Sequence, residues 1–89
     1  MRASIMSEKM GLEQFSDVRM VRIKSRNYTL LIMEDFAPTL GRIRGDVCIL
    51  TQDDEVIYEN ILGYFQQKDN VFSLLIGEKR YEERRRDAK

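Results

Sequence analysis

Residues 18–76 read VRMVRIKSRNYTLLIMEDFAPTLGRIRGDVCILTQDDEVIYENILGYFQQKDNVFSLLI. The segment is a succession of short runs rich in β-branched and aromatic residues, separated by Gly, Pro, Asn, Asp and Ser. Such runs predict β-strands, and the residues between them predict turns. The clearest pair is 64–66 with 72–74, which the turn at 68–70 joins into a hairpin. The stretch therefore predicts a small all-β body, a flattened β-sandwich or barrel of short antiparallel strands.

The remaining runs of this segment predict further strands. Residues 18–24 alternate apolar and basic side chains, which indicates a strand with one solvent-exposed face. Residues 28–33 are continuously rich in β formers, so we expect them to be buried on both faces. The runs at 47–51 and 56–58 flank an acidic turn and predict another hairpin. Residues 42–44 lie between two glycines and predict a short, edge-like segment.

Outside this segment the patterns are weaker. Residues 3–6 and 12–15 predict a hairpin, although a helical turn at 9–15 is an alternative. Residues 78–89 are almost entirely charged and rich in helix formers, and Glu82 with Arg86 forms a supporting i,i+4 pair. We therefore expect residues 1–77 to form the β domain and residues 78–89 to form a charged tail that is helical or disordered.

The charge balance limits the choice of partner. The chain of 89 residues has 15 basic and 15 acidic residues, so its formal net charge is zero. A neutral chain lacks the clustered basic surplus that phosphate neutralisation requires, which argues against nucleic-acid binding. Four basic residues do lie close together in the sequence, and they are Arg19, Arg22, Lys24 and Arg26. A solvated strand face explains them best, and a face for a charged partner is the alternative.

Catalytic and metal-binding constellations are missing from the sequence. There is no histidine and a single cysteine, Cys48, which excludes Ser/His and Cys/His nucleophiles and His- or Cys-based metal sites. Cys48 lies in an apolar run, so we expect it to be buried and inert. The adjacent acids at 34–35 and 53–55 resemble solvated turn tips more than cation ligands. We expect no enzymatic activity, no cofactor and no metal.

The sequence also predicts a cytoplasmic location. No apolar stretch approaches the roughly 20 residues of a membrane helix, and residues 1–9 lack the apolar segment of a signal peptide. A lone cysteine is typical of a reducing compartment. A position at the periphery of a membrane complex is compatible with these features.

Aromatic residues are the candidates for a contact surface. Phe36 lies beside Pro38, the only proline, and is interpreted as a core plug in preference to an exposed anchor. Tyr64 and Phe65 are neighbours on a strand, so one should face inward and the other outward. An outward aromatic ring beside Gly63, where we expect a β-bulge or a close backbone approach, would be a strong partner contact.

The segments 18–38 and 58–78 resemble the N-terminal β-sandwich domain of the epsilon subunit of F-type ATP synthases. That family has a corner of the form Gly-x-x-Gly-Ile-Leu-Pro-x-His-Ala-Pro, and residues 28–38 are similar to it at Ile32-Met33 and at Ala37-Pro38. The family's Gly-Gly-Phe before its last hairpin corresponds to 62–64. The opening strand and turn are similar to residues 5–9.

The chain departs from the family pattern at several positions. Phe36 replaces the corner histidine, Glu34 replaces the first corner proline, and Leu62 replaces one glycine of the Gly-Gly pair. The resemblance implies a sandwich that attaches to the rotating gamma stalk and to the ring of c subunits, with Phe36, Pro38, Gly63 and Tyr64 as contact residues. The family's C-terminal helical hairpin would be reduced to a stub, so its inhibitory and nucleotide-binding roles are not implied.

Two other functions fit the sequence. The first is a small β adaptor or ligand-binding module that self-associates through an edge strand such as 18–24. The second is a weak RNA-binding module that uses the four basic residues with nearby aromatics, against which the neutral charge counts.

Overall fold

The computed structural model describes residues 1–77 and the backbone of residues 82–87. All elements in these ranges are β-strands, so the predicted all-β class is confirmed. In chain order they are β1 (Arg2–Ser7), β2 (Gly11–Phe15), β3 (Val18–Ser25), β4 (Tyr28–Ile32), β5 (Thr39–Thr51), β6 (Asp54–Lys68), β7 (Val71–Ile76) and β8 (Glu82–Asp87). Within these ranges there is no helix long and apolar enough to cross a membrane.

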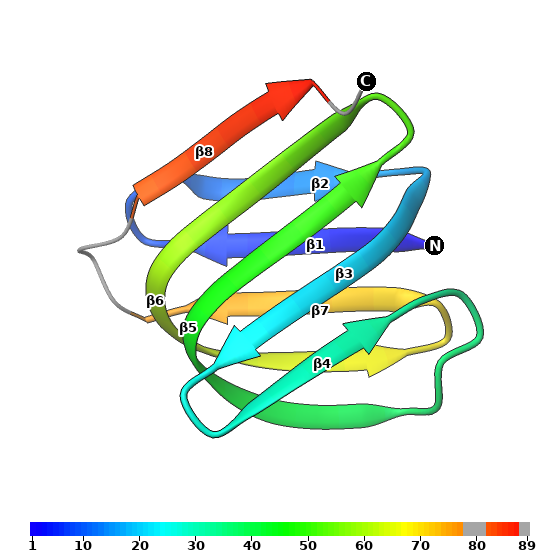
Figure 1. Ribbon diagram of the computed structural model, residues 1–89, viewed down its shortest axis with the longest axis horizontal. Helices are drawn as coiled ribbons and strands as arrows, with labels where there is room; N and C mark the ends of the chain where they lie inside the picture. The colour runs from blue at the N-terminus through cyan, green and yellow to red at the C-terminus, as the bar shows by residue number, and fades with distance from the viewer. Residues whose placement is uncertain (78–81, 88–89) are drawn as a thin grey trace.

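The strands form one mixed sheet that folds over on itself. Its main path runs β2-β1-β7-β6-β5-β3-β4, and β8 pairs with β6 beside this path. The strands β5 and β6 have 13 and 15 residues, and both curve through the molecule so that their halves lie in different layers (Figure 1). One layer contains β1, β2 and β7, and the other contains β3, β4 and β8. We call them the β1–β2–β7 layer and the β3–β4 layer.

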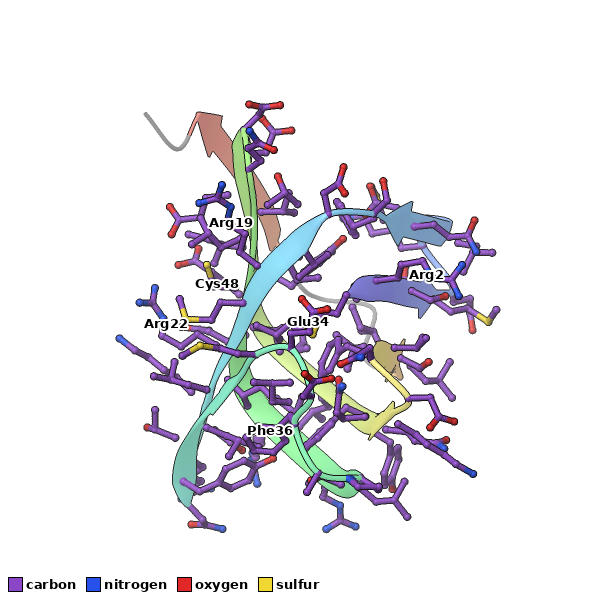
Figure 2. The ribbon with its side chains drawn as sticks, turned by 90° about the vertical axis from the view of Figure 1, so that its right-hand side faces the viewer. Arg2, Arg19, Arg22, Glu34, Phe36 and Cys48 are labelled. Carbon is purple, nitrogen blue, oxygen red and sulfur yellow. The ribbon has the colours of Figure 1, made fainter. Side chains whose placement is uncertain are left out.

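The core fills the space between the two layers (Figure 2). Alternation along each strand sends every second side chain inward, where burial of apolar surface stabilises the fold. The largest core side chains are Tyr58 and Phe72, both fully buried. The buried apolar cluster consists of Ala3, Ile5, Val18, Val21, Ile23, Ile32, Ile43, Val47, Ile49, Val56, Tyr58, Ile61, Phe65, Phe72, Leu74 and Ile76.

A β-bulge lies where the sheet bends. Glu59 and Asn60 of β6 both lie opposite Asp46 of β5, because the register shifts between the pairs on either side of them. Asn60 has a φ of 58°, and its N–H donates to Asp46 Oδ1 over 2.9 Å. The bulge shifts the alternation by one residue, so Tyr58 before it and Ile61 after it both face the core. The predicted bulge at Gly63 is therefore wrong by three positions.

Two glycines are required because backbones approach closely. A Cβ on Gly63 would lie 2.5 Å from the carbonyl oxygen of Leu75, so the alternative prediction for Gly63, a close backbone approach, is confirmed. A Cβ on Gly45 would collide with the carbonyl oxygen of Lys24, at the point where β3 meets the bend of β5. Any other residue at these two positions would push neighbouring strands apart.

The clearest predicted hairpin and the weakest one are both present. Asp69 and Asn70, with φ of 53° and 61°, form the turn between β6 and β7, as expected for a two-residue hairpin with the strand twist. In that hairpin Tyr64 pairs with Leu75. The hairpin of β1 with β2 is also confirmed, with Ala3 opposite Phe15.

Three details of the predicted strands are wrong. Residues 28–33 are not buried on both faces, because β4 ends the path and its Leu31 is 45% exposed. The strand β3 is not an edge, since it lies between β4 and β5. Residues 42–44 lie at a local edge, because β3 pairs with β5 only as far as Gly45, but they belong to one long strand.

The predicted helical tail is wrong over Glu82–Asp87. These residues form β8, which pairs antiparallel with residues 54–59 of β6. The strand β7 pairs only with residues 63–68 of β6, so the first half of β6 offers an unpaired edge to β8. Backbone pairing at an open edge outweighs the helix propensity of a short segment that has no apolar stripe to dock. Residues 78–81 and 88–89 lie outside the described residues.

Candidate partner-docking face

The predicted contact residues divide between the surface and the interior. Tyr64 is 60% exposed and Phe65 only 4%, so the expected opposition of these neighbours is confirmed. Gly63 is buried beneath Tyr64, and Pro38 is exposed just before β5. Phe36 is half-buried and packs against the core, as the plug interpretation predicts.

Tyr64 lies in a row of exposed side chains that crosses five strands. Cross-strand pairing places Leu12 opposite Met6, Met6 opposite Leu75, Leu75 opposite Tyr64, and Tyr64 opposite Arg42. These are outward positions of β2, β1, β7, β6 and β5, on the outer side of the β1–β2–β7 layer. Direct cross-strand neighbours are close enough for their side chains to touch, so the row is continuous.

Two further leucines extend this row into a patch. Leu40 is 76% exposed and Leu62 42% exposed, and each shares a surface hollow with Tyr64. The hollow that includes Met6, Leu40 and Leu75 has a volume of about 410 Å³. We define the docking face as the six exposed apolar residues of this outer surface, which are Met6, Leu12, Leu40, Leu62, Tyr64 and Leu75. Contiguous exposed apolar surface of this kind marks interaction sites.

Pro38 borders the docking face, whereas Phe36 does not belong to it. Pro38 lines a hollow of about 380 Å³ together with Leu40 and Gln66. The structure therefore brings two of the four predicted contact residues, Pro38 and Tyr64, to one surface, and Gly63 is the buried strand neighbour of Tyr64. Figure 2 places Phe36 between the two layers, away from that surface.

The docking face has a basic rim. Its outward strand positions include Arg2 and Lys68 at one side and Arg42 and Arg44 at the other, and none of the outward strand positions described in this layer carries Asp or Glu. The Arg42 guanidinium lies 5.8 Å from the centre of the Tyr64 ring, a cation–π contact that orients both side chains. An apolar centre with a polar rim is the usual anatomy of a protein interface.

Sequence reasoning missed most members of the docking face. Leu75 lies in the apolar run 74–76, which looks like a fully buried strand. Met6 and Leu12 join Tyr64 only because β1 pairs in parallel with β7, at the other end of the sequence. Along residues 62–65 the outward positions of Leu62 and Tyr64 alternate with the inward positions of Gly63 and Phe65. This two-residue period was the one sequence signal that could have added Leu62 to the predicted contact residues.

Of the four basic residues of 19–26, Arg19, Arg22 and Lys24 lie at outward positions of β3, and Arg26 lies apart from them. Arg19 and Arg22 project from the outer side of the β3–β4 layer, together with Cys48 and opposite to Arg2 (Figure 2). Arg26 lies in the turn after β3, beside β5. No described outward strand position of the β3–β4 layer carries an aromatic residue, so the base-stacking platform of the RNA-binding alternative is missing there.

The thiol and the acidic turns have structural partners. Cys48 is 7% exposed, as expected, and its Sγ donates to Glu55 Oε2 over 3.3 Å. Asp35 exchanges two hydrogen bonds with Asn70, since its N–H donates to Oδ1 over 2.6 Å and its Oδ1 accepts from Nδ2 over 3.1 Å. Among the residues that the structure describes, no group of three or more His, Cys, Asp or Glu side chains could hold a metal ion.

Comparison with known proteins adds no family assignment. A scan against protein-family models finds no match. A search of curated proteins finds no matching sequence.

Proposed function

We propose that this protein is a non-catalytic docking subunit that binds a partner protein through the docking face. We further propose that it acts like the epsilon subunit that it resembles, as a coupling subunit attached to the rotor stalk and c-ring of an ATP synthase. Its place would then be the cytoplasmic surface of that membrane complex.

One observation carries the proposal. Six large apolar side chains are 42–76% exposed on adjacent strands of one layer, and Tyr64 lies in their middle. Exposed apolar side chains scattered singly are normal, but a contiguous patch with an aromatic centre and an arginine beside it has the composition of a binding hot spot.

The charges of the rim favour a different protein over a second copy of this chain. In a two-fold symmetric dimer the docking face would meet itself, and the basic residues of both rims would be brought together. A partner with an apolar surface and an acidic rim would be complementary instead. The chain as a whole is neutral, so this local excess belongs to the face.

Co-purification from the native cells under mild detergent tests this function. The gamma and c subunits should be recovered with the wild-type chain, and Tyr64→Glu should reduce their recovery by about tenfold or more, because a charge would be buried at the centre of the interface. Leu31→Glu is the matched control, since Leu31 is 45% exposed on the other layer.

Two outcomes would contradict the proposal. Recovery of neither gamma nor c subunits with the wild-type chain would remove the coupling role. Sedimentation equilibrium that gives a dimer for wild type and a monomer for Tyr64→Glu would assign the face to self-association.

A further inference from the structure

A second surface feature lies at the side of the docking face, where the β3–β4 turn meets β5. Arg26 comes from that turn, and Arg42 and Arg44 are successive outward residues of β5. Together with Ser25, Asn27 and Tyr28 they line an open hollow of about 520 Å³. We call it the arginine hollow.

Hydrogen bonds fix the turn against β5. The Arg44 N–H donates to Ser25 Oγ over 2.9 Å, and the Arg44 carbonyl accepts from the Arg26 N–H over 2.9 Å. The Tyr28 hydroxyl donates to the Arg42 carbonyl over 2.6 Å. The backbones that carry the three arginines are therefore held in a fixed relation, so a ligand would not have to order them first.

The arginine hollow is unusually positive for a neutral chain. No Asp or Glu lines it, and no ion pair within the described residues involves Arg26, Arg42 or Arg44. Three like charges around one hollow repel each other, and a multivalent anion between them would relieve that repulsion. The Asn27 amide adds neutral donors at the same place.

We propose that the arginine hollow binds the phosphate groups of a small ligand that carries two or more phosphates. Guanidinium groups present paired donors that match two oxygens of one phosphate, and such charge-assisted bonds are the strong ones. Two backbone-anchored arginines on β5 and a third across the hollow suit neighbouring phosphates better than a single carboxylate. The ligand is a free oligophosphate or a phosphorylated headgroup on a membrane surface.

The test is a titration of the full chain with diphosphate at low ionic strength. Binding is measured from the NMR chemical shifts of the backbone amides. Saturable shifts should appear at residues 25–28 and 42–44. Arg26→Gln with Arg44→Gln should weaken binding by about tenfold or more, because charge-assisted hydrogen bonds are lost. Arg19→Gln with Arg22→Gln is the matched control, since it removes the same charge from the other layer and should leave affinity within about twofold.

A second arm distinguishes the two sources of phosphate. Binding to vesicles that contain a phosphatidylinositol bisphosphate, but not to free diphosphate, would assign a headgroup, whereas binding to diphosphate in solution assigns a free ligand. Three results would overturn the proposal: no saturable binding of either probe, equal weakening by the control pair, or equal affinity for citrate. The docking test uses Tyr64, which does not line the arginine hollow, so either proposal can fail alone.

Discussion

Gln67 is the residue whose placement is least favourable in this core. Its side chain is fully buried, and neither Nε2 nor Oε1 has a hydrogen-bond partner among the described residues. A buried amide without partners loses its hydration and gains nothing in return. It lies between Thr39 of β5 and Phe72 of β7, where its neighbours Phe65 and Phe72 stack with ring centres 5.6 Å apart.

Replacement of Gln67 by leucine should therefore stabilise the protein. We expect Gln67→Leu to raise the free energy of unfolding by about 1 kcal/mol, because the unsatisfied amide is removed and the volume is nearly kept. For a domain of this size the melting temperature should rise by about 4–8 °C in a thermal scan. Gln66→Leu is the control, since Gln66 is exposed and should change little. A lower melting temperature for Gln67→Leu would mean that the amide has a polar partner.

The ionisation of the Tyr28 phenol should make the stability of the fold depend on pH in the alkaline range. Burial raises the pKa of its phenol above the ordinary value of 10.0, and a hydrogen bond with Ser25 acts in the opposite direction. The folded state therefore favours the neutral phenol, which donates to the Arg42 carbonyl. A group with a raised pKa contributes its full stability below the unfolded pKa and loses it as pH rises through the folded pKa.

The measurement is urea unfolding of wild type and Tyr28→Phe from about pH 8 to about pH 11. Wild type should lose stability more steeply than Tyr28→Phe above about pH 10, while below it the two curves should run parallel. Parallel curves across the whole range would show that Tyr28 ionises equally in the folded and unfolded states.

At the scale of elements, β6 decides how the sheet is built. Its first half pairs with β8 and its second half with β7, and the bulge at Asn60 separates the two. The chain thus uses one long strand as the shared member of two layers. Bulges of this kind are where a sheet turns a corner and changes its twist.

Loss of β8 should expose half of β6. Arg85→Pro removes a backbone donor in the middle of β8 and should prevent its pairing. We expect amide hydrogen exchange of residues 54–59 to accelerate by about tenfold or more, since their outer hydrogen bonds open. Exchange in the β6–β7 hairpin, which β8 does not touch, serves as the internal reference. Unchanged exchange at 54–59 would mean that β5 alone protects these amides.

Some elements could be predicted because their signals are local. The Asp69-Asn70 turn and the alternation of Tyr64 with Phe65 need only neighbouring residues. The bulge could not be placed, because Asn60 adopts a conformation for which Gly63 is the more usual candidate. The sequence does not predict the strand β8, because β8 forms by pairing with an open edge of β6. That edge exists only in the assembled sheet.

At the scale of the molecule, the docking face depends on long-range pairing that no local pattern encodes. Tyr64 was predicted as a contact residue, but Met6 and Leu12 reach it only through β1 and β7. The arginine hollow likewise joins Arg26 to Arg42 and Arg44 through the hydrogen bonds of Ser25 and of the Arg44 carbonyl. Sequence patterns predict which residues face outward, and the register determines which of them become neighbours.

The parallel pairing of β1 with β7 has a consequence for synthesis of the protein. Residues 2–7 emerge from the ribosome before the other strands of the sheet, and their parallel partner, residues 71–76, emerges only after β2 to β6 have been translated. Until then the core side chain Ile5 of β1 has no β7 beside it. Pairing of β1 with β7 is also slow, because the long loop of chain between them has to close. Because β2 can pair early with one edge of β1, the nascent chain must keep only the other edge, which later receives β7, open and soluble for most of translation, the interval in which a chaperone would have the greatest effect on yield.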